Sequence, residues 1–135
     1  MKRFYMIFAV AAMAALTLLS CEKYEDGKPA KSVRSEFAEM YPDARDVEWE
    51  AEAGYWKVSF ETGKAPAVQE HEAWYDADGG WIRTETEVYI SDLPKKVLDA
   101  IAASEYDSAV IDRNDVVYVE TPESSWYRLE LFLGG

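Results

Sequence analysis

One segment, in which apolar and polar residues alternate, limits the fold of this chain more than any other feature. From Val47 to Phe60, every second residue is apolar on each side of a turn at Gly54. A period of two sends successive side chains to opposite faces of a strand, so the segment predicts two strands that share one apolar face. With Ala53 and Gly54 as a two-residue turn, these strands form a β-hairpin.

The register set by this turn is favourable on both faces, because it joins apolar with apolar residues and a carboxylate with an amine. We therefore assign Trp49 and Trp56 to the core. The predicted cross-strand pairs are Trp49 with Val58, Val47 with Phe60, and Glu50 with Lys57.

A second hairpin is predicted over residues 68–88, with Asp78 and Gly79 at its turn. Its expected pairs are Tyr75 with Ile82, Ala73 with Thr84, Asp76 with Trp81, and Trp74 with Arg83. In this register, Trp74 and Trp81 both lie among carboxylates, on the face of the sheet turned away from the helices. They form a candidate binding face, whose expected members are Trp74, Trp81, Arg83, Tyr55, Lys57, Trp126 and Arg128. In the alternative interpretation, the rings stabilise the sheet, or a one-residue bulge turns them into the core.

Two short helices complete the pattern. The first is predicted over residues 32–41, capped by Ser32 and stopped by Pro42. The second opens at Asp92 and Pro94, and strands follow at about 109–120 and 126–133. The element order αββββαββ predicts an α+β fold, with both helices packed on one face of a curved antiparallel sheet of about six strands.

The N-terminal segment is typical of a targeting signal. Lys2 and Arg3 precede an apolar run of 16 residues, Phe4 to Leu19, which is shorter than the roughly 20 residues of a membrane-spanning helix. The order Leu18-Leu19-Ser20-Cys21 resembles a bacterial lipobox. We expect a signal peptide at 1–20, a lipidated Cys21 with a flexible tether over 21–31, and one domain at 32–135. The alternative is an ordinary secretory signal with an incidental cysteine.

The net charge of the exported chain limits the classes of partner that it can bind. Removal of Lys2 and Arg3 changes the net charge from −12 to −14, with 12 basic against 26 acidic residues. Such a surface repels nucleic acid and favours encounter with a basic protein or peptide. We expect a location in the cell envelope, most simply at the outer membrane, facing the periplasm or the exterior. The membrane contact is the N-terminal lipid.

The sequence offers no set of catalytic or metal-binding residues, and no cofactor is expected. His71 is the only histidine, and Cys21 is the only cysteine. A zinc site or a histidine-dependent triad therefore lacks partners, and His71 is predicted near the core face. Part of a calcium-binding loop is imitated by Asp76, Asp78 and Glu87. The motif is incomplete, because it needs a ligand at the position of Gly80 and a glycine at the position of Trp81.

Several segments together resemble a known family. They are "FAEMYPDARDVEWE" (37–50), "YWKVSFE" (55–61), "EAWYDADGGWIRTETEV" (72–88), "LPKKVLDAI" (93–101) and "VETPESSWYRLEL" (119–131). These resemble the beta-lactamase-inhibitor-like, PepSY-like domains of bacterial lipoproteins. The resemblance implies helices on one side of a curved antiparallel sheet, export with frequent lipid anchoring, and no established enzymatic activity. Relatives by fold include inhibitors that bind enzymes through the sheet.

Three hypotheses about function follow, in order of preference. The first is a non-enzymatic binding module of the envelope that holds, and could thereby inhibit, a protein on its open sheet face. The second is a structural or accessory lipoprotein with no dedicated ligand. The third is a hydrolase, which would need an acidic residue within hydrogen-bond reach of His71.

Overall fold

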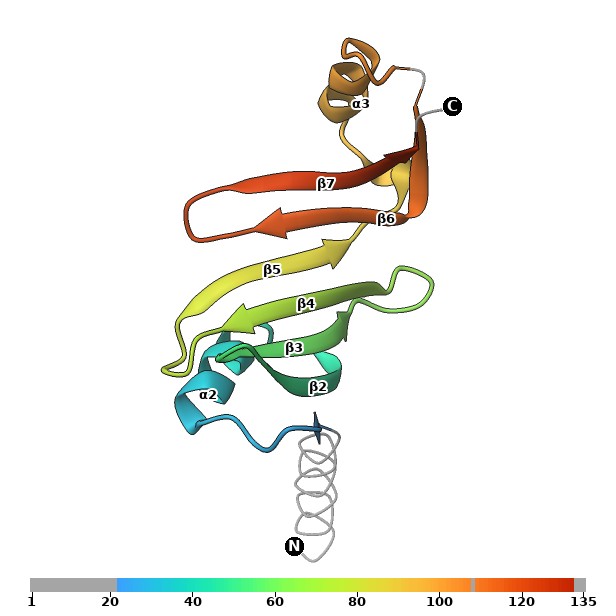
Figure 1. Cartoon of the computed structure of the whole chain (residues 1–135). Coiled ribbons are helices and arrows are strands. Elements are labelled where there is room, and N and C mark those ends of the chain that lie inside the picture. The colour runs from blue at the N-terminus through green and yellow to red at the C-terminus, as the bar shows by residue number, and fades with distance from the viewer. Residues whose placement is uncertain (1–21, 108, 133–135) are drawn as a thin grey trace, which may run out of the picture.

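The computed structural model describes residues 22–107 and 109–132, apart from the side chains of residues 110 and 112–115. The predictions for the signal peptide and for Cys21 lie outside these residues. The chain forms one sheet in which seven strands follow the order of the sequence, as Figure 1 shows. All neighbouring strands are antiparallel except the first pair. The strands are β1 (Lys23–Tyr24), β2 (Arg45–Glu52), β3 (Tyr55–Thr62), β4 (Gln69–Tyr75), β5 (Trp81–Glu87), β6 (Val110–Glu120) and β7 (Ser125–Phe132).

The helices confirm the predicted α+β class. They are α2 (Lys31–Met40), the short 3-10 helix η1 (Ile90–Asp92) and α3 (Lys95–Ala102). No helix in the described part of the chain is long and apolar enough to cross a membrane. The predicted capping by Ser32 is wrong, because α2 already begins at Lys31 and Ala30 precedes it without a side-chain cap.

The core lies between α2 and the first four long strands. Val33 and Phe37 of α2 are buried against Trp49, Val58 and other side chains of β2 to β4. The Phe37 ring meets the Trp49 ring edge to face, with centroids 5.3 Å apart. An eight- to ten-residue helix is not stable alone, so this aromatic packing is what holds α2 in place.

The first hairpin confirms the predicted turn and most of its register. Trp49 lies opposite Val58, and Glu50 lies opposite Lys57. Ala53 and Gly54 both have positive φ, 50° and 86°, as a two-residue hairpin turn requires. The predicted pair of Val47 with Phe60 is not formed, because β2 carries one extra residue between Arg45 and Glu48.

The second hairpin departs from prediction at one residue, and the departure decides where its tryptophans lie. Ala73 pairs with Thr84 and Trp74 with Arg83, as expected, but Tyr75 pairs with Trp81 instead of Ile82. A bulge therefore inserts Ile82 into β5 and reverses the parity of Trp81. The expected pairs of Tyr75 with Ile82 and of Asp76 with Trp81 are wrong.

The segment expected to be a flexible tether contains structure. Lys23 and Tyr24 form β1, which pairs in parallel with Glu48 and Trp49 of β2. The following turn is held by the carboxylate of Asp26, which accepts the backbone N–H of Ala51 at 3.1 Å. The sheet thus begins two residues after Cys21.

α3 covers the sheet less than predicted. No residue of α3 is buried, although Leu93 just before it is. In Figure 1, α3 stands beyond β7 at the end of the sheet, whereas α2 lies against the other end. The apolar stripe of α3, with Val97 and Ile101 half-buried, therefore lacks the close packing that α2 obtains.

Candidate functional site

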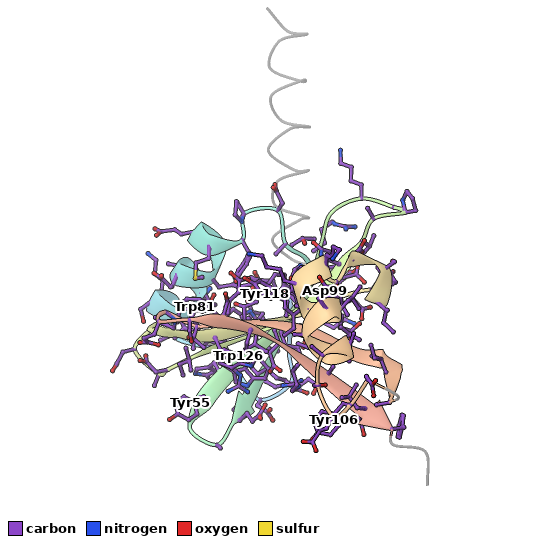
Figure 2. All side chains as sticks on the ribbon, turned by 90° about the horizontal axis from the view of Figure 1, so that it is seen from above. Tyr55, Trp81, Asp99, Tyr106, Tyr118 and Trp126 are labelled. Atoms are coloured by element: carbon purple, nitrogen blue, oxygen red, sulfur yellow. The ribbon has the colours of Figure 1, made fainter. Side chains whose placement is uncertain are left out.

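The face of the sheet turned away from α2 is the candidate site, and we call it the open face. Cross-strand pairing places one residue after another on it from β3 to β7. Its members include Lys57, Ser59, Glu72, Trp74, Arg83, Glu85, Val117, Val119, Trp126 and Arg128. Figure 2 shows the two faces from above: Trp81 and Tyr118 lie on the side of α2, and Tyr55 and Trp126 lie on the opposite side.

The bulge separates the two tryptophans of the second hairpin. Trp81 packs against the core, and its indole N–H donates to the hydroxyl of Thr84 at 2.9 Å. The hydroxyls of Thr84 and Tyr41 are 2.6 Å apart, so Thr84 joins Trp81 to the end of α2. The expectation that Trp81 lies on the binding face is therefore wrong, and the alternative of a bulge applies to this ring.

Trp74 stays on the open face, as predicted, but it is only 7% exposed. The guanidinium of Arg83 covers its ring, with Cζ 3.9 Å from the ring centroid. A cation at this distance is attracted by the electrons of the indole ring. The ring thus forms part of the floor of the open face.

A groove of about 510 Å³ lies beside Trp74, and we call it the acidic groove. Its wall carries five glutamates of three neighbouring strands, namely Glu61, Glu70, Glu72, Glu85 and Glu87, together with Trp74, Val117 and Arg128. Glu61 lies directly opposite Glu70, and Glu72 lies directly opposite Glu85. Like charges in such positions destabilise a sheet, so the groove is costly for the fold.

Two arginines neutralise one of these glutamates. Arg128 Nη1 forms an ion pair with Glu85, and Arg83 Nε lies 3.3 Å from the other carboxylate oxygen of Glu85. Within the described residues, no lysine or arginine lies within 4 Å of Glu61, Glu70 or Glu72. The charge of the groove is therefore only partly balanced by the chain itself.

The remaining predicted residues share the open face but do not line the groove. Lys57 binds Glu50 at 2.6 Å, and this hydrogen bond raises the pKa of Lys57 and lowers that of Glu50. Tyr55 and Trp126 are 48% and 47% exposed. Of the seven predicted binding residues, only Trp74 and Arg128 line the groove, while Arg83 touches both Trp74 and Glu85.

The glutamates of the groove were not recognised as a site from the sequence. The sequence does contain one signal for this site. On each of the two strands of the second hairpin, every second residue near the open end is a glutamate, namely Glu70, Glu72, Glu85 and Glu87. A carboxylate row on one strand is ordinarily a solvated face. The same row on two paired strands brings like charges together.

His71 lies on the core face, as predicted. Its ring stacks on Phe60 with centroids 4.9 Å apart. Its two ring nitrogens lie 2.6 Å and 2.7 Å from the hydroxyls of Thr62 and Thr86. Burial lowers the pKa of His71, which favours the neutral ring. Both nitrogens thus bond to threonine hydroxyls, and no described carboxylate forms the hydrogen bond that a hydrolase would need.

In the turn that resembles a calcium loop, the first carboxylate, that of Asp76, accepts backbone hydrogen bonds. Asp76 Oδ1 accepts the N–H groups of Asp78 and Gly80, each at 2.9 Å. These hydrogen bonds lower the pKa of Asp76. Among the described residues, no group of three or more histidine, cysteine, aspartate or glutamate side chains is arranged to hold a metal ion.

Comparison with known proteins places this architecture in a family. Residues 54–132 match the model of the beta-lactamase-inhibitor-like, PepSY-like family. None of the curated proteins matches the chain.

Solved structures agree with the family model. A BLIP-like protein from Bacteroides fragilis is 31% identical, with a TM-score of 0.70 over 82% of this chain and 76% of that one. A DUF2874 family protein from Bacteroides ovatus is 27% identical, with a TM-score of 0.69 over 78% and 72%. Another DUF2874 family protein, from Bacteroides uniformis, is 25% identical, with a TM-score of 0.66 over 78% and 74%. The chain therefore belongs to the beta-lactamase-inhibitor-like, PepSY-like family.

Proposed function

We propose that this protein is a lipid-anchored, non-enzymatic binding module of the cell envelope that holds a basic segment of a partner protein in its acidic groove. The groove beside Trp74 is the observation that carries the proposal. It is concave, it is lined by five glutamates, and its floor is an indole ring. The similarity to a BLIP-like protein supports a role in binding, since that name denotes likeness to an inhibitor.

The charge of the groove favours a partner that carries lysine or arginine. Glu61 of β3 lies opposite Glu70 of β4, and no lysine or arginine of the described chain forms an ion pair with either carboxylate. Arg45 lies opposite Glu61 on β2, but its guanidinium donates to the backbone oxygen of Gly63. A cationic side chain of a partner relieves this repulsion and gains charge-assisted hydrogen bonds. The same contacts are unavailable to an acidic or neutral segment, so the groove selects by charge.

The anchor and the fold together orient the groove. We propose that Cys21 is lipidated and holds the protein at the outer membrane. β1 begins at Lys23, so the edge of the sheet formed by β1 and β2 stands about 7 Å of extended chain from that cysteine. The open face then stands beside the membrane surface rather than being pressed onto it, which leaves the groove accessible to proteins of the envelope.

A matched pair of variants tests the function. The probe is an octapeptide of alternating lysine and alanine, and its affinity is measured by fluorescence anisotropy. In the triple variant Glu61→Gln/Glu70→Gln/Glu72→Gln, we expect an affinity lower by about tenfold or more, since 1.4 kcal/mol corresponds to a factor of ten. The control Glu36→Gln/Glu39→Gln/Glu123→Gln removes the same charge from α2 and from the β6–β7 turn, and it leaves the affinity nearly unchanged.

One observation favours the second candidate, a structural or accessory lipoprotein without a ligand. The open face already neutralises part of its own charge, through Arg83, Arg128 and Lys57. Equal losses of affinity in the groove variant and in its control would show that only net charge attracts the peptide. That result would reject the groove as a binding site and support the accessory role.

A further inference from the structure

A second groove lies between the end of α2 and the start of β2, and we call it the apolar groove. Its volume of about 550 Å³ is within the range of roughly 300–1,000 Å³ that is typical of small-ligand sites. Its apolar lining consists of Phe37, Ala38, Tyr41, Pro42, Ala44 and Val47. Phe37 and Val47 belong to the buried core, whereas Ala38 and Pro42 are exposed. The groove therefore leads from the surface to the core.

The chain enters the domain at this groove. Glu22 is one of the lining residues, and Cys21 directly precedes it in the sequence. Neighbouring Cα atoms are about 3.8 Å apart, so a group attached to Cys21 starts beside the groove. In Figure 1, β1 and α2 lie at the same end of the sheet.

Contacts with the sheet fix the position of Glu22. The hydroxyl of Tyr24 donates to its carboxylate. Lys23 and Tyr24 pair with β2, and the backbone N–H of Glu25 donates to the backbone oxygen of Trp49 at 3.2 Å. A flexible tether would be sufficient for a membrane anchor. The ordering of these residues is explained if the anchor itself has a site on the domain.

The charge of the groove indicates the chemical class of its ligand. Its polar lining contains three acids, Glu22, Asp43 and Asp46, and one base, Arg45, whose guanidinium donates to the backbone oxygen of Gly63. The carboxylate of a free fatty acid is repelled by such a rim, whereas an acyl chain in ester or amide linkage carries no charge. Attachment at Cys21 also gives the acyl chain a high effective concentration at the groove, which no free ligand has.

We infer that the apolar groove holds one acyl chain of the lipid on Cys21, while the other chains of that lipid stay in the bilayer. This inference rests on the proposed lipidation of Cys21. The bound chain holds the α2 end of the sheet at the membrane surface. The open face, on the side away from α2, stays accessible to a partner. The apolar groove thus orients the acidic groove.

Photo-crosslinking of the full chain in membranes tests this site. Cells that export the protein are fed a palmitic acid with a diazirine near the end of its chain, and their isolated membranes are irradiated. Peptide mass spectrometry should find the acyl chain crosslinked within the protein to residues 37–47. The mass of the intact mature protein shows separately whether Cys21 is acylated, and Cys21→Ser should carry no label.

Variants of one exposed alanine identify the groove. Ala38→Trp fills it and Ala38→Glu makes it polar, so each should lower the crosslinks at residues 37–47 about tenfold. The matched control Ala102→Trp, at an exposed alanine of α3, should leave them unchanged. Circular dichroism on heating checks that all three variants fold.

The outcomes separate the groove from the anchor. An acylated parent chain that crosslinks only to membrane lipids overturns the inference and leaves the proposed anchor standing. The inference is also overturned if neither Ala38 variant lowers the crosslinks, or if Ala102→Trp lowers them equally. A mature chain without an acyl group overturns both the anchor and the inference, whereas the peptide affinity of the acidic groove is measured independently.

Discussion

Replacing Glu70 with glutamine should stabilise the fold while it weakens the proposed binding. Glu70 lies directly opposite Glu61, and no described lysine or arginine lies within 4 Å of either carboxylate. Opposed side chains of this kind have Cβ atoms about 5 Å apart. A functional carboxylate that is unfavourable for the fold gives this combination of effects, whereas an ordinary surface glutamate gives neither.

The magnitude follows from the geometry. Two unit charges about 6 Å apart repel by about 0.7 kcal/mol in a medium with the dielectric constant of water. Salt screening reduces this value and partial burial increases it, so we take about 0.5 kcal/mol. For a domain of this size, Glu70→Gln should raise the melting temperature by about 2–3 °C.

Calorimetry at two salt concentrations is the assay. The gain should be present at low salt and mostly vanish at about 1 M salt, where the Debye length is about 3 Å. Glu123→Gln, in the β6–β7 turn, is the matched control and should leave the melting temperature unchanged. A Glu70→Gln variant that melts at the same temperature as the parent, or lower, would refute the view that the groove carries unrelieved repulsion.

Three further predictions concern the fold that positions the groove. Trp81→Phe removes the hydrogen bond to Thr84 and part of the buried ring, so urea unfolding should show a loss of about 1–2 kcal/mol, whereas Trp126→Phe at an exposed position should show almost none. Because burial lowers the pKa of His71 below its usual 6.5, the neutral ring favours the fold. Stability should therefore be full above pH 6.5 and fall as the pH drops through the folded pKa, and a His71→Asn variant should show a smaller decrease between pH 7 and 5. Gly79→Ala should lower the free energy of unfolding by about 1–2 kcal/mol, because Gly79 has a φ of 100° and an added Cβ would lie 3.0 Å from the backbone oxygen of Ser32 in α2. The melting temperature, followed by circular dichroism, should fall; an unchanged melting temperature would contradict this prediction.

Most of the fold was predictable because alternation and turn residues act locally. The pairs of Trp49 with Val58 and Glu50 with Lys57 follow from a two-residue turn and from a period of two. The turn residues and the apolar face agree on one register, and such agreement is what a single sequence can reveal.

The position of Trp81 was not predictable from the same rules. One inserted residue, Ile82, reverses the parity of the strand, and the contacts that favour it come from distant parts of the chain. Thr84 bonds both to Trp81 and to Tyr41, which is 43 residues away in sequence. A bulge held by tertiary hydrogen bonds leaves no signal in the local pattern.

The position of α3 was also not predictable from the pattern of apolar residues. Its apolar stripe correctly indicates a helix with one face to cover, but a stripe does not identify what covers it. α2 obtains Phe37 and Trp49 as packing partners within the chain. In α3 no residue is buried, and only Leu93 just before the helix is.

Nuclear magnetic resonance of the indole N–H groups tests the central claim, binding in the acidic groove, most directly. The five tryptophans give separate signals, and Trp74 lines the groove while Trp49 and Trp81 lie in the core. Titration with the alternating lysine–alanine octapeptide should shift the Trp74 signal, together with the backbone signals of Glu61, Glu70 and Glu72. A glutamate–alanine octapeptide should shift none of them. Equal shifts with both peptides, or shifts confined to α2 and its core, would contradict the account.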